Sequence, residues 1–498
     1  MMQSTTIKAS EPETQATDVA RVAGRGTIYI TASKLWFLAS GAAIYYVLTR
    51  LMSREQFGLY QVVTGIVSIV NAVVVTGTSQ TVSKYISQDE SKADSVKSKA
   101  LRLQLSVGGG LALLFAALAP VVADYLNDSG LTNYLRLAAL ITLSYSFYSV
   151  YTGYFNGQKK FLTQAGLDMA YSTMKLAFIV LLVWLGFGVA GAIGGFALAA
   201  ACILGVSAIA AGRGGRKGEV RTRDLFAFQI NLLLFTLVLN LLQKTDLILV
   251  KALSSPDAKI ASDNAGSYGA AVYVANITFQ VIISATFVIF PLVSQSTFAN
   301  DLRRTQVYVS NTIRYTLMIM ALLATLFSAN AGGVMSVIYP EAYKSGAVAL
   351  GIVAFGMLFF GLFYVMTTII SASGRPKVSL IIGALTLAAS AGSNALLIPR
   401  YGIRGAAIAT TASMLLGVLA GGGYLIAKFN ALVPGLSLLR IAFCAGAVYA
   451  ASLAFAPDSK LLIIGKLIVL SLVYVALLAV SREIGRDDLA ALKKVAGK

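Results

Sequence analysis

Apolar blocks of about twenty residues recur along almost the whole chain and limit what it can fold into. A helix of about twenty residues crosses a hydrocarbon core about 30 Å thick, so each block is long enough for one crossing. Hydrophobic residues make up 57% of the 498 positions and charged residues only 12%; a soluble domain carries about 25% charged residues. Because helices satisfy their backbone groups internally in lipid, the sequence predicts an all-α integral membrane protein.

The apolar blocks are separated by Gly, Pro and charged residues and number about fourteen. The predicted crossings are 28–50, 57–82, 101–122, 132–154, 164–185, 187–211, 225–250, 265–297, 307–330, 345–372, 377–399, 402–428, 436–456 and 460–481.

Basic residues gather in alternate loops, and this predicts the orientation. One set of loops, which includes 84–102 and 213–223, holds most of the Lys and Arg, whereas the other set includes the 124–128 turn, which has none. The positive-inside rule places the first set in the cytoplasm, so both termini are expected inside and the protein in the cell membrane. This distribution accounts for the net charge of +19 without a nucleic-acid partner.

Three short patterns occur twice in the same order, which indicates an internal repeat. The pairs are Gly58-Leu59-Tyr60 with Gly266-Ser267-Tyr268, Gly157-Gln158-Lys159-Lys160 with Gly374-Arg375-Pro376-Lys377, and Gly188-Val189-Ala190-Gly191 with Gly402-Ile403-Arg404-Gly405. Each pair occupies matching loops of a six-span unit, so the two copies enter the membrane in the same direction. We expect a pseudo-twofold axis along the membrane normal and a central cavity between two bundles.

The repeat divides the chain into two six-helix lobes and a C-terminal helix pair. The predicted parts are a cytoplasmic tail at 1–27, an N-terminal lobe at 28–211, a C-terminal lobe at 225–428, an extra helix pair at 436–481 and a cytoplasmic tail at 482–498.

Missing motifs favour a transporter over an enzyme. The chain has no phosphate-binding G-x-x-x-x-G-K-[ST] loop, and no long external loop carries the paired carboxylates of a glycan-transferring enzyme. It has no His, and its two cysteines, Cys202 and Cys444, lie inside apolar blocks. We expect no catalytic residue, no cofactor and no metal site.

Ionisable residues inside predicted spans are costly and therefore mark candidate sites. Lys175 lies near the middle of its span, too deep for its stem to reach the headgroups easily, and is expected to face a cavity. Asp168 and Tyr171 share its helical face. Lys34 is nearer a span end, so either a cavity or the headgroups could receive its ammonium group.

Span 225–250 carries both Lys244 and Asp246, which point to nearly opposite sides of a helix. Asp246 could bind a coupling proton or sodium ion, or it could pair with a Lys of a neighbouring helix. Pro291 removes a backbone hydrogen bond from its span and predicts a kink, useful either for packing or for opening of the bundle.

The segment 48–60 resembles the first-loop signature of polysaccharide-transporter (Wzx-type) flippases, in which Arg-Leu-x-x-x-x-x-[FY]-G-x-Y follows the first span. Here that pattern begins at Arg50 and ends at Tyr60. Asp246, Gly266-Ser267-Tyr268 and Pro291 are also similar to the second half of that family, and the likeness extends over nearly the whole chain. The family belongs to a larger group with multidrug-extrusion (MATE) carriers and lipid II flippases such as MurJ.

The resemblance implies two lobes that alternate between inward-open and outward-open states, and a polyprenyl-linked oligosaccharide as the cargo. Such a cargo carries a phosphate or pyrophosphate, which a cationic cavity would stabilise. Depth and charge select Lys175, Lys34 and Lys244 for that role. The alternative reading is a cation-coupled exporter of drugs or metabolites, for which Asp246 and Asp168 would be the acidic residues. The expected partners are the lipid-linked oligosaccharide and membrane lipids, with H+ or Na+ as the candidate coupling ions.

Overall fold

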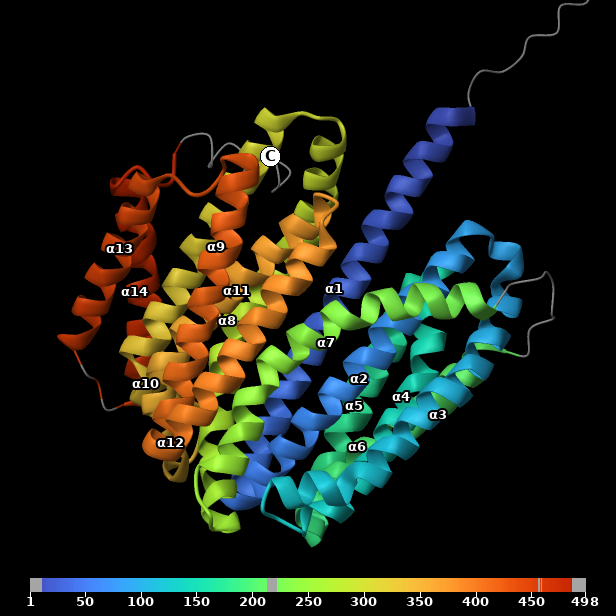
Figure 1. Ribbon diagram of the computed structural model, residues 1–498, viewed down its shortest axis with the longest axis horizontal. Helices are drawn as coiled ribbons and strands as arrows, with labels where there is room; N and C mark the ends of the chain where they lie inside the picture. The colour runs from blue at the N-terminus through green and yellow to red at the C-terminus, as the bar shows by residue number, and fades with distance from the viewer. Residues whose placement is uncertain (1–10, 213–221, 456, 458, 486–498) are drawn as a thin grey trace, which may run out of the picture. The chain divides into compact units, whose positions relative to one another are not determined.

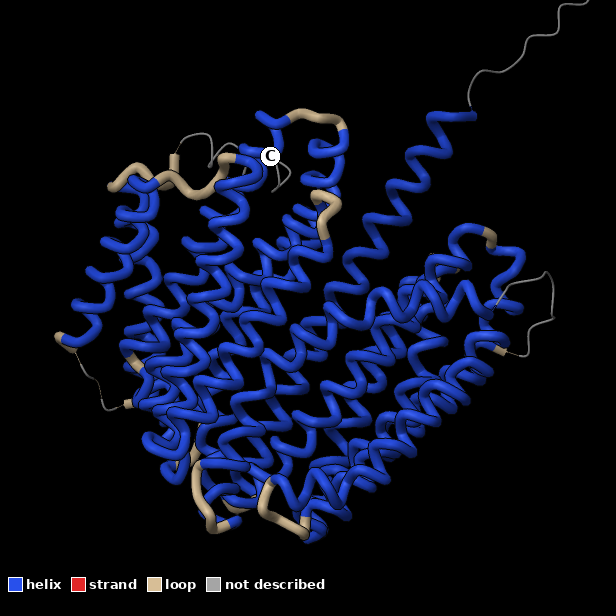
Figure 2. Tube along the Cα trace, viewed as in Figure 1, coloured by secondary structure: helices blue, strands red, loops and turns tan. Residues whose placement is uncertain are grey.

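The computed structural model describes residues 11–212, 222–455, 457 and 459–485, and all its regular elements are helices (Figure 2). Nine stretches of the described residues are long and apolar enough to cross a membrane. Two of them, 161–211 and 376–429, are each long enough for two crossings. The described residues form fourteen α-helices, and the prediction of an all-α membrane protein with about fourteen helices is confirmed.

The chain forms two compact units. Unit 1 comprises residues 1–51, 67–121 and 130–236, and unit 2 comprises 52–66, 122–129 and 237–498. Two short segments from the first third of the chain therefore belong to the unit built mainly by its second half. The predicted lobe boundaries do not anticipate this exchange.

In unit 1, α1 packs along α5, and both α4 and α5 pack against α6 (Figure 1). The helices with most of their length in this unit are α1 (Glu11–Leu51), α2 (Arg54–Gln88), α3 (Ala93–Tyr125), α4 (Leu131–Gly157), α5 (Phe161–Leu182) and α6 (Gly188–Ala211). The next helix, α7 (Thr222–Leu253), begins in unit 1 and ends in unit 2.

In unit 2, α11 is the most enclosed helix and packs against α8, α9 and α12. The red hairpin of α13 and α14 in Figure 1 packs against α9 and α10. The helices are α8 (Ala258–Phe298), α9 (Leu302–Ala329), α10 (Ala331–Ile338), α11 (Ala347–Ala372), α12 (Pro376–Phe429), α13 (Gly435–Leu453) and α14 (Lys460–Val480). A short 3-10 segment, η3 (Glu341–Gly346), precedes α11.

The hairpins within 161–211 and 376–429 turn at corresponding glycines. Gly188 has φ 51° and ψ −130°, and Gly402 has φ 54° and ψ −135°. A side chain rarely tolerates such positive φ values, so Gly is required at both turns. The equal geometry agrees with the repeat that pairs these two residues.

The loops after α4 and α11 are also alike, but in a different register from the predicted one. The left-handed residue is Lys159 (φ 58°) in the first loop and Gly374 (φ 82°) in the second. Lys160 and Arg375 follow them and donate backbone hydrogen bonds to Phe155 and Ile370, five residues back in each case. Lys159 therefore corresponds to Gly374, and the pairing of Gly157 with Gly374 is wrong by two residues. The two turns share a backbone conformation and not the type of residue that adopts it.

Two helices differ from their predicted extents. α1 is helical from Glu11, where the described residues begin, and continues without a break into the first span, so the described part of the predicted tail is helical. α8 remains helical through position 291. The side chain of Pro291 lies outside the described residues, and its kink stays a prediction.

Candidate functional site

The predicted residues of unit 1 gather where α5 meets α1, α4 and α6. The Lys34 ammonium of α1 lies 4.0 Å from the Asp168 carboxylate of α5, although the Lys34 side chain is 69% exposed. The Tyr148 hydroxyl of α4 donates a hydrogen bond of 2.9 Å to the same carboxylate. Asp168 thus has two partners, of which the exposed Lys34 ammonium is the weaker because water screens it.

Lys175 lies two turns further along α5, and its surroundings differ. Its ammonium nitrogen stands 3.8 Å from the centre of the Phe196 ring of α6, which is a cation–π contact. The residues described in unit 1 include no carboxylate paired with Lys175. Lys175 is therefore the cation of this cluster whose charge no acidic side chain balances.

Aromatic rings line the same part of unit 1. Tyr145 packs edge-on against Tyr171 at 5.3 Å and against Phe196 at 6.4 Å between ring centres, and Tyr148 lies 6.1 Å from Tyr171. Of these rings the sequence analysis singled out only Tyr171, and the group as a whole was not predicted. Its only signal was the spacing Tyr145-x-x-Tyr148, which places both rings on one face of α4.

In unit 2, Asp246 of α7 is buried within a polar cluster. Its carboxylate accepts a hydrogen bond of 2.7 Å from the Tyr268 hydroxyl of α8 and another from the backbone of Leu247. In the described parts of the chain Asp246 forms no ion pair, so the alternative in which it pairs with a Lys of a neighbouring helix finds no support there.

The cluster around Asp246 continues into α12. The Thr410 side chain of α12 lies near the Tyr268 hydroxyl and accepts a hydrogen bond of 3.3 Å from the Asn394 amide. Asn394 is fully buried, and its side-chain oxygen has no hydrogen-bond partner among the described residues. Sequence analysis quoted Tyr268 but missed Thr410 and Asn394, because residues on three helices can be brought together only by tertiary packing.

Lys244 lies two residues before Asp246 and is half-buried. A Cβ placed on Gly65 of α2 would lie 3.9 Å from the Lys244 side chain, so this stem packs against α2. The described residues provide no hydrogen bond or ion pair for its ammonium group. Unit 2 therefore also holds a half-buried cation inside a predicted span.

A separate apolar cavity of about 320 Å³ lies between α8 and α9. It is lined by Ile282, Ile289, Leu292, Tyr308, Asn311, Thr312, Tyr315, Thr316 and Ile319. No charged side chain lines it among these residues, so this cavity is not the predicted cationic one.

Solved structures with the same arrangement of helices are membrane transporters. The lipid II flippase MurJ in an inward closed conformation superimposes with a TM-score of 0.72 at 14% identity, over 92% of this chain and 99% of that one. An inward-facing multidrug resistance MATE transporter gives 0.62 at 14% identity, over 81% and 98%. A transporter of the same MOP superfamily from Pyrococcus furiosus gives 0.61 at 16% identity, over 82% and 96%. The chain therefore has the fold of this transporter class.

The sequence comparison defines the family more narrowly. The family described as "Polysaccharide biosynthesis protein" matches residues 47–348, which is more than half of the 498 residues. The chain belongs to this family, and the resemblance found from the segment 48–60 is confirmed. No curated protein matches the sequence significantly.

Proposed function

We propose that the protein is a flippase that moves a polyprenyl phosphate- or pyrophosphate-linked oligosaccharide across the cytoplasmic membrane by alternating access. Membership of the polysaccharide biosynthesis family is the observation that carries this proposal. It is a transporter, and its role in glycan synthesis is to carry a finished lipid-linked unit to the outer leaflet.

Cations at membrane depth suit the anionic part of this cargo. A phosphate that leaves water loses its hydration, and charge-assisted hydrogen bonds offset that loss. Lys175 is the best placed, since no carboxylate among the described residues pairs with it. Lys244 comes next, because the nearby Asp246 carboxylate interacts with its charge. Lys34 serves more weakly because Asp168 lies 4.0 Å from it.

The direction of transport follows from the predicted topology. The positive-inside rule places both termini and the Lys- and Arg-rich loops in the cytoplasm, where the cargo is assembled. The N-terminal lobe (28–211) and the C-terminal lobe (225–428) would alternate around the cations, and the helix pair at 436–481 would be an addition to the second lobe.

In the proposed cycle, a coupling cation binds at the Asp246 cluster and its binding drives transport. The cluster is rich in oxygen atoms: it contains a buried carboxylate, two hydroxyl groups and the unpaired side-chain oxygen of Asn394. A bound H+ or Na+ would offset the negative charge of the carboxylate, and oxygen atoms are the ligands that hard cations prefer. Asp168 is the second candidate, since its partners Lys34 and Tyr148 would respond to its protonation.

Reconstitution into liposomes tests the function. A fluorescent polyprenyl-pyrophosphate sugar placed in one leaflet should appear in the other faster than in protein-free liposomes. An equal rate in both preparations would reject the flippase. The exporter alternative, favoured by the MATE-like fold and the Asp246 and Asp168 carboxylates, predicts instead that cationic dyes accumulate and that the lipid stays in its leaflet.

A further inference from the structure

The two copies of the Gly-x-Tyr pattern meet at their glycines in unit 2. A Cβ on Gly58 of α2 would stand 2.7 Å from the backbone nitrogen of Gly266 in α8 and would meet the carbonyl oxygen of Ser262. A Cβ on Gly266 would in turn meet the carbonyl oxygen of Arg54. The contact is reciprocal, and it explains why each copy of the pattern has Gly at this position: only Gly lets the two backbones approach so closely.

Polar and aromatic side chains close this contact, which we call the α2–α8 seam (residues 53–61 at the start of α2 with 257–269 at the start of α8). The Gln61 amide donates to the Gly266 carbonyl at 3.3 Å. Phe57 is fully buried, and its ring meets that of Tyr343 in η3 edge-on at 5.6 Å. The seam is thus packed like a protein interior.

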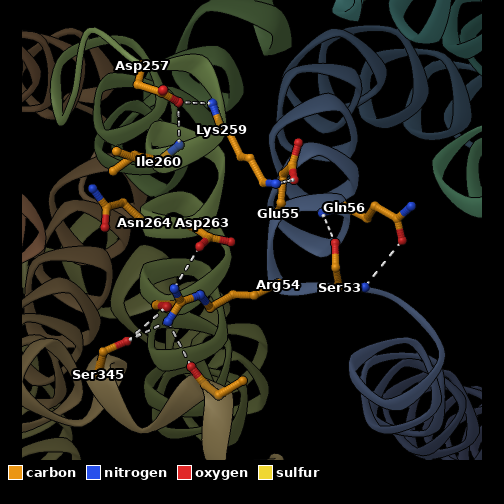
Figure 3. Close-up of polar contacts among 12 residues, drawn as sticks. Ser53, Arg54, Glu55, Gln56, Asp257, Lys259, Ile260, Asp263, Asn264 and Ser345 are labelled. Atoms are coloured by element: carbon orange, nitrogen blue, oxygen red, sulfur yellow. Dashed lines mark hydrogen bonds and ion pairs between the residues drawn. The ribbon is translucent and has the colours of Figure 1, made fainter.

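Arg54 joins three elements at the end of the seam. Its guanidinium group donates to the Asp263 carboxylate at 2.7 Å and to the carbonyl oxygen of Ala342 in η3 at 2.9 Å. The Arg54 and Asp263 side chains are each 31% exposed, so water can compete for this pair. Next to it, Lys259 and Glu55 form a longer ion pair of 3.9 Å that is more exposed (Figure 3).

A second set of polar contacts joins the 122–129 segment to the rest of unit 2. The ammonium group of Lys251, at the end of α7, is fully buried and reaches the Asp128 carboxylate at 2.8 Å. It also donates to the Ser262 hydroxyl at 2.7 Å, and Ser262 is the residue whose carbonyl group Gly58 approaches. The two segments that come from the first third of the chain are therefore both fastened to the start of α8.

We propose that the α2–α8 seam is the outer gate of the transport cycle and that the Arg54–Asp263 pair is its latch. All loops that contribute to it belong to the set with few basic residues, which the predicted topology places outside. The inference rests on the proposed function, because a gate has a role only in a protein that moves a cargo. The latch is partly hydrated and would break first, after which the glycine contact can part.

A labelling experiment tests the gate without any cargo. Ser267 is 2% exposed and lies between Gly266 and Tyr268 in the seam, so Ser267→Cys, with Cys202 and Cys444 replaced by Ser, reports opening. A membrane-impermeant maleimide is added to the outside of intact cells. Arg54→Ala and Asp263→Ala should each raise the labelling rate roughly five-fold, which corresponds to a pair worth ~1 kcal/mol.

Charge reversal separates a latch from general damage. Arg54→Asp combined with Asp263→Arg should return the labelling rate towards that of the parent. Lys344→Ala, which removes an exposed pair with Glu341 in η3, is the matched control and should have little effect. Unchanged labelling in both alanine variants, or reagent access only from the cytoplasmic side, would overturn the gate. If the protein flips no lipid in liposomes but the labelling rates change as expected, the proposed cargo is wrong and the gate is still supported.

Discussion

Gly58 of α2 and Gly266 of α8 approach so closely that a Cβ on Gly58 would stand 2.7 Å from the Gly266 backbone nitrogen. The obstacle is backbone, which cannot rotate away as a side chain can. The closed seam therefore depends on the absence of two Cβ atoms.

Gly58→Ala should prevent the seam from closing and slow transport. Overpacking of a close contact costs about 1–3 kcal/mol, so the initial rate of lipid flipping in liposomes is expected to fall at least five-fold. Gly110→Ala in α3 is the matched control, because a Cβ there meets nothing within 4 Å. Equal rates for the two variants would mean that the glycine contact is not needed in the cycle.

Lys175→Ala should impair transport while membrane insertion remains normal. A hydrogen bond to a charged group contributes about 1.5–3 kcal/mol, so the initial flipping rate is expected to fall about ten-fold or more. Lys160→Ala removes an exposed cation at the start of the same helix, α5, and should transport normally. If both variants match the parent, Lys175 does not bind the cargo.

The sequence predicted the helices well because lipid imposes a length and an apolar composition on every crossing. It also located both halves of the seam: Gly58-Leu59-Tyr60 and Gly266-Ser267-Tyr268 were identified as equivalent loops. Their mutual contact was not predicted, since the repeat compares two segments and says nothing of whether they touch.

The partners of the charged residues were harder to predict. Lys251 directly follows the predicted span 225–250 and was not selected as a candidate, yet its side chain is fully buried against Asp128, which is 123 positions away in the chain. Lys34 was selected by depth and charge and Asp168 by the helical face that it shares with Lys175, and only the packing of α1 along α5 brings them together. Spacing along a helix identifies neighbours within that helix, whereas these pairs join different helices.

Asp246→Asn should abolish the response of transport to a coupling cation. The substitution keeps the size of the side chain and removes its charge, so flipping should no longer accelerate under an imposed Na+ or proton gradient. Tyr268→Phe removes one hydrogen bond of 2.7 Å and should weaken the response without removing it. Glu90→Gln changes an exposed carboxylate between α2 and α3 and serves as the control. A gradient response in Asp246→Asn equal to that of the parent would exclude Asp246 as the coupling site.

Glu483 fastens the C-terminal hairpin to α9. Its side chain is 2% exposed and lies 3.4 Å from the Arg314 guanidinium of α9 and 3.7 Å from that of Arg440 in α13. A buried charge that loses its partner is strongly destabilising, so this carboxylate must be balanced in the folded protein. Sequence analysis gave neither arginine a site, because Glu483 follows the last crossing.

Glu483→Ala should therefore lower the thermal stability of the purified protein more than Arg440→Ala does. Loss of Glu483 leaves two guanidinium groups facing each other, at a cost of about 2 kcal/mol, which is less than the 3–5 kcal/mol of a fully buried pair because Arg440 is 33% exposed. Loss of Arg440 leaves Glu483 still balanced by Arg314. The midpoint of thermal unfolding in detergent measures both effects, and Lys460→Ala, at the exposed start of α14, should leave it unchanged. A larger loss for Arg440→Ala than for Glu483→Ala would show that Arg440 supports the hairpin through contacts other than this carboxylate.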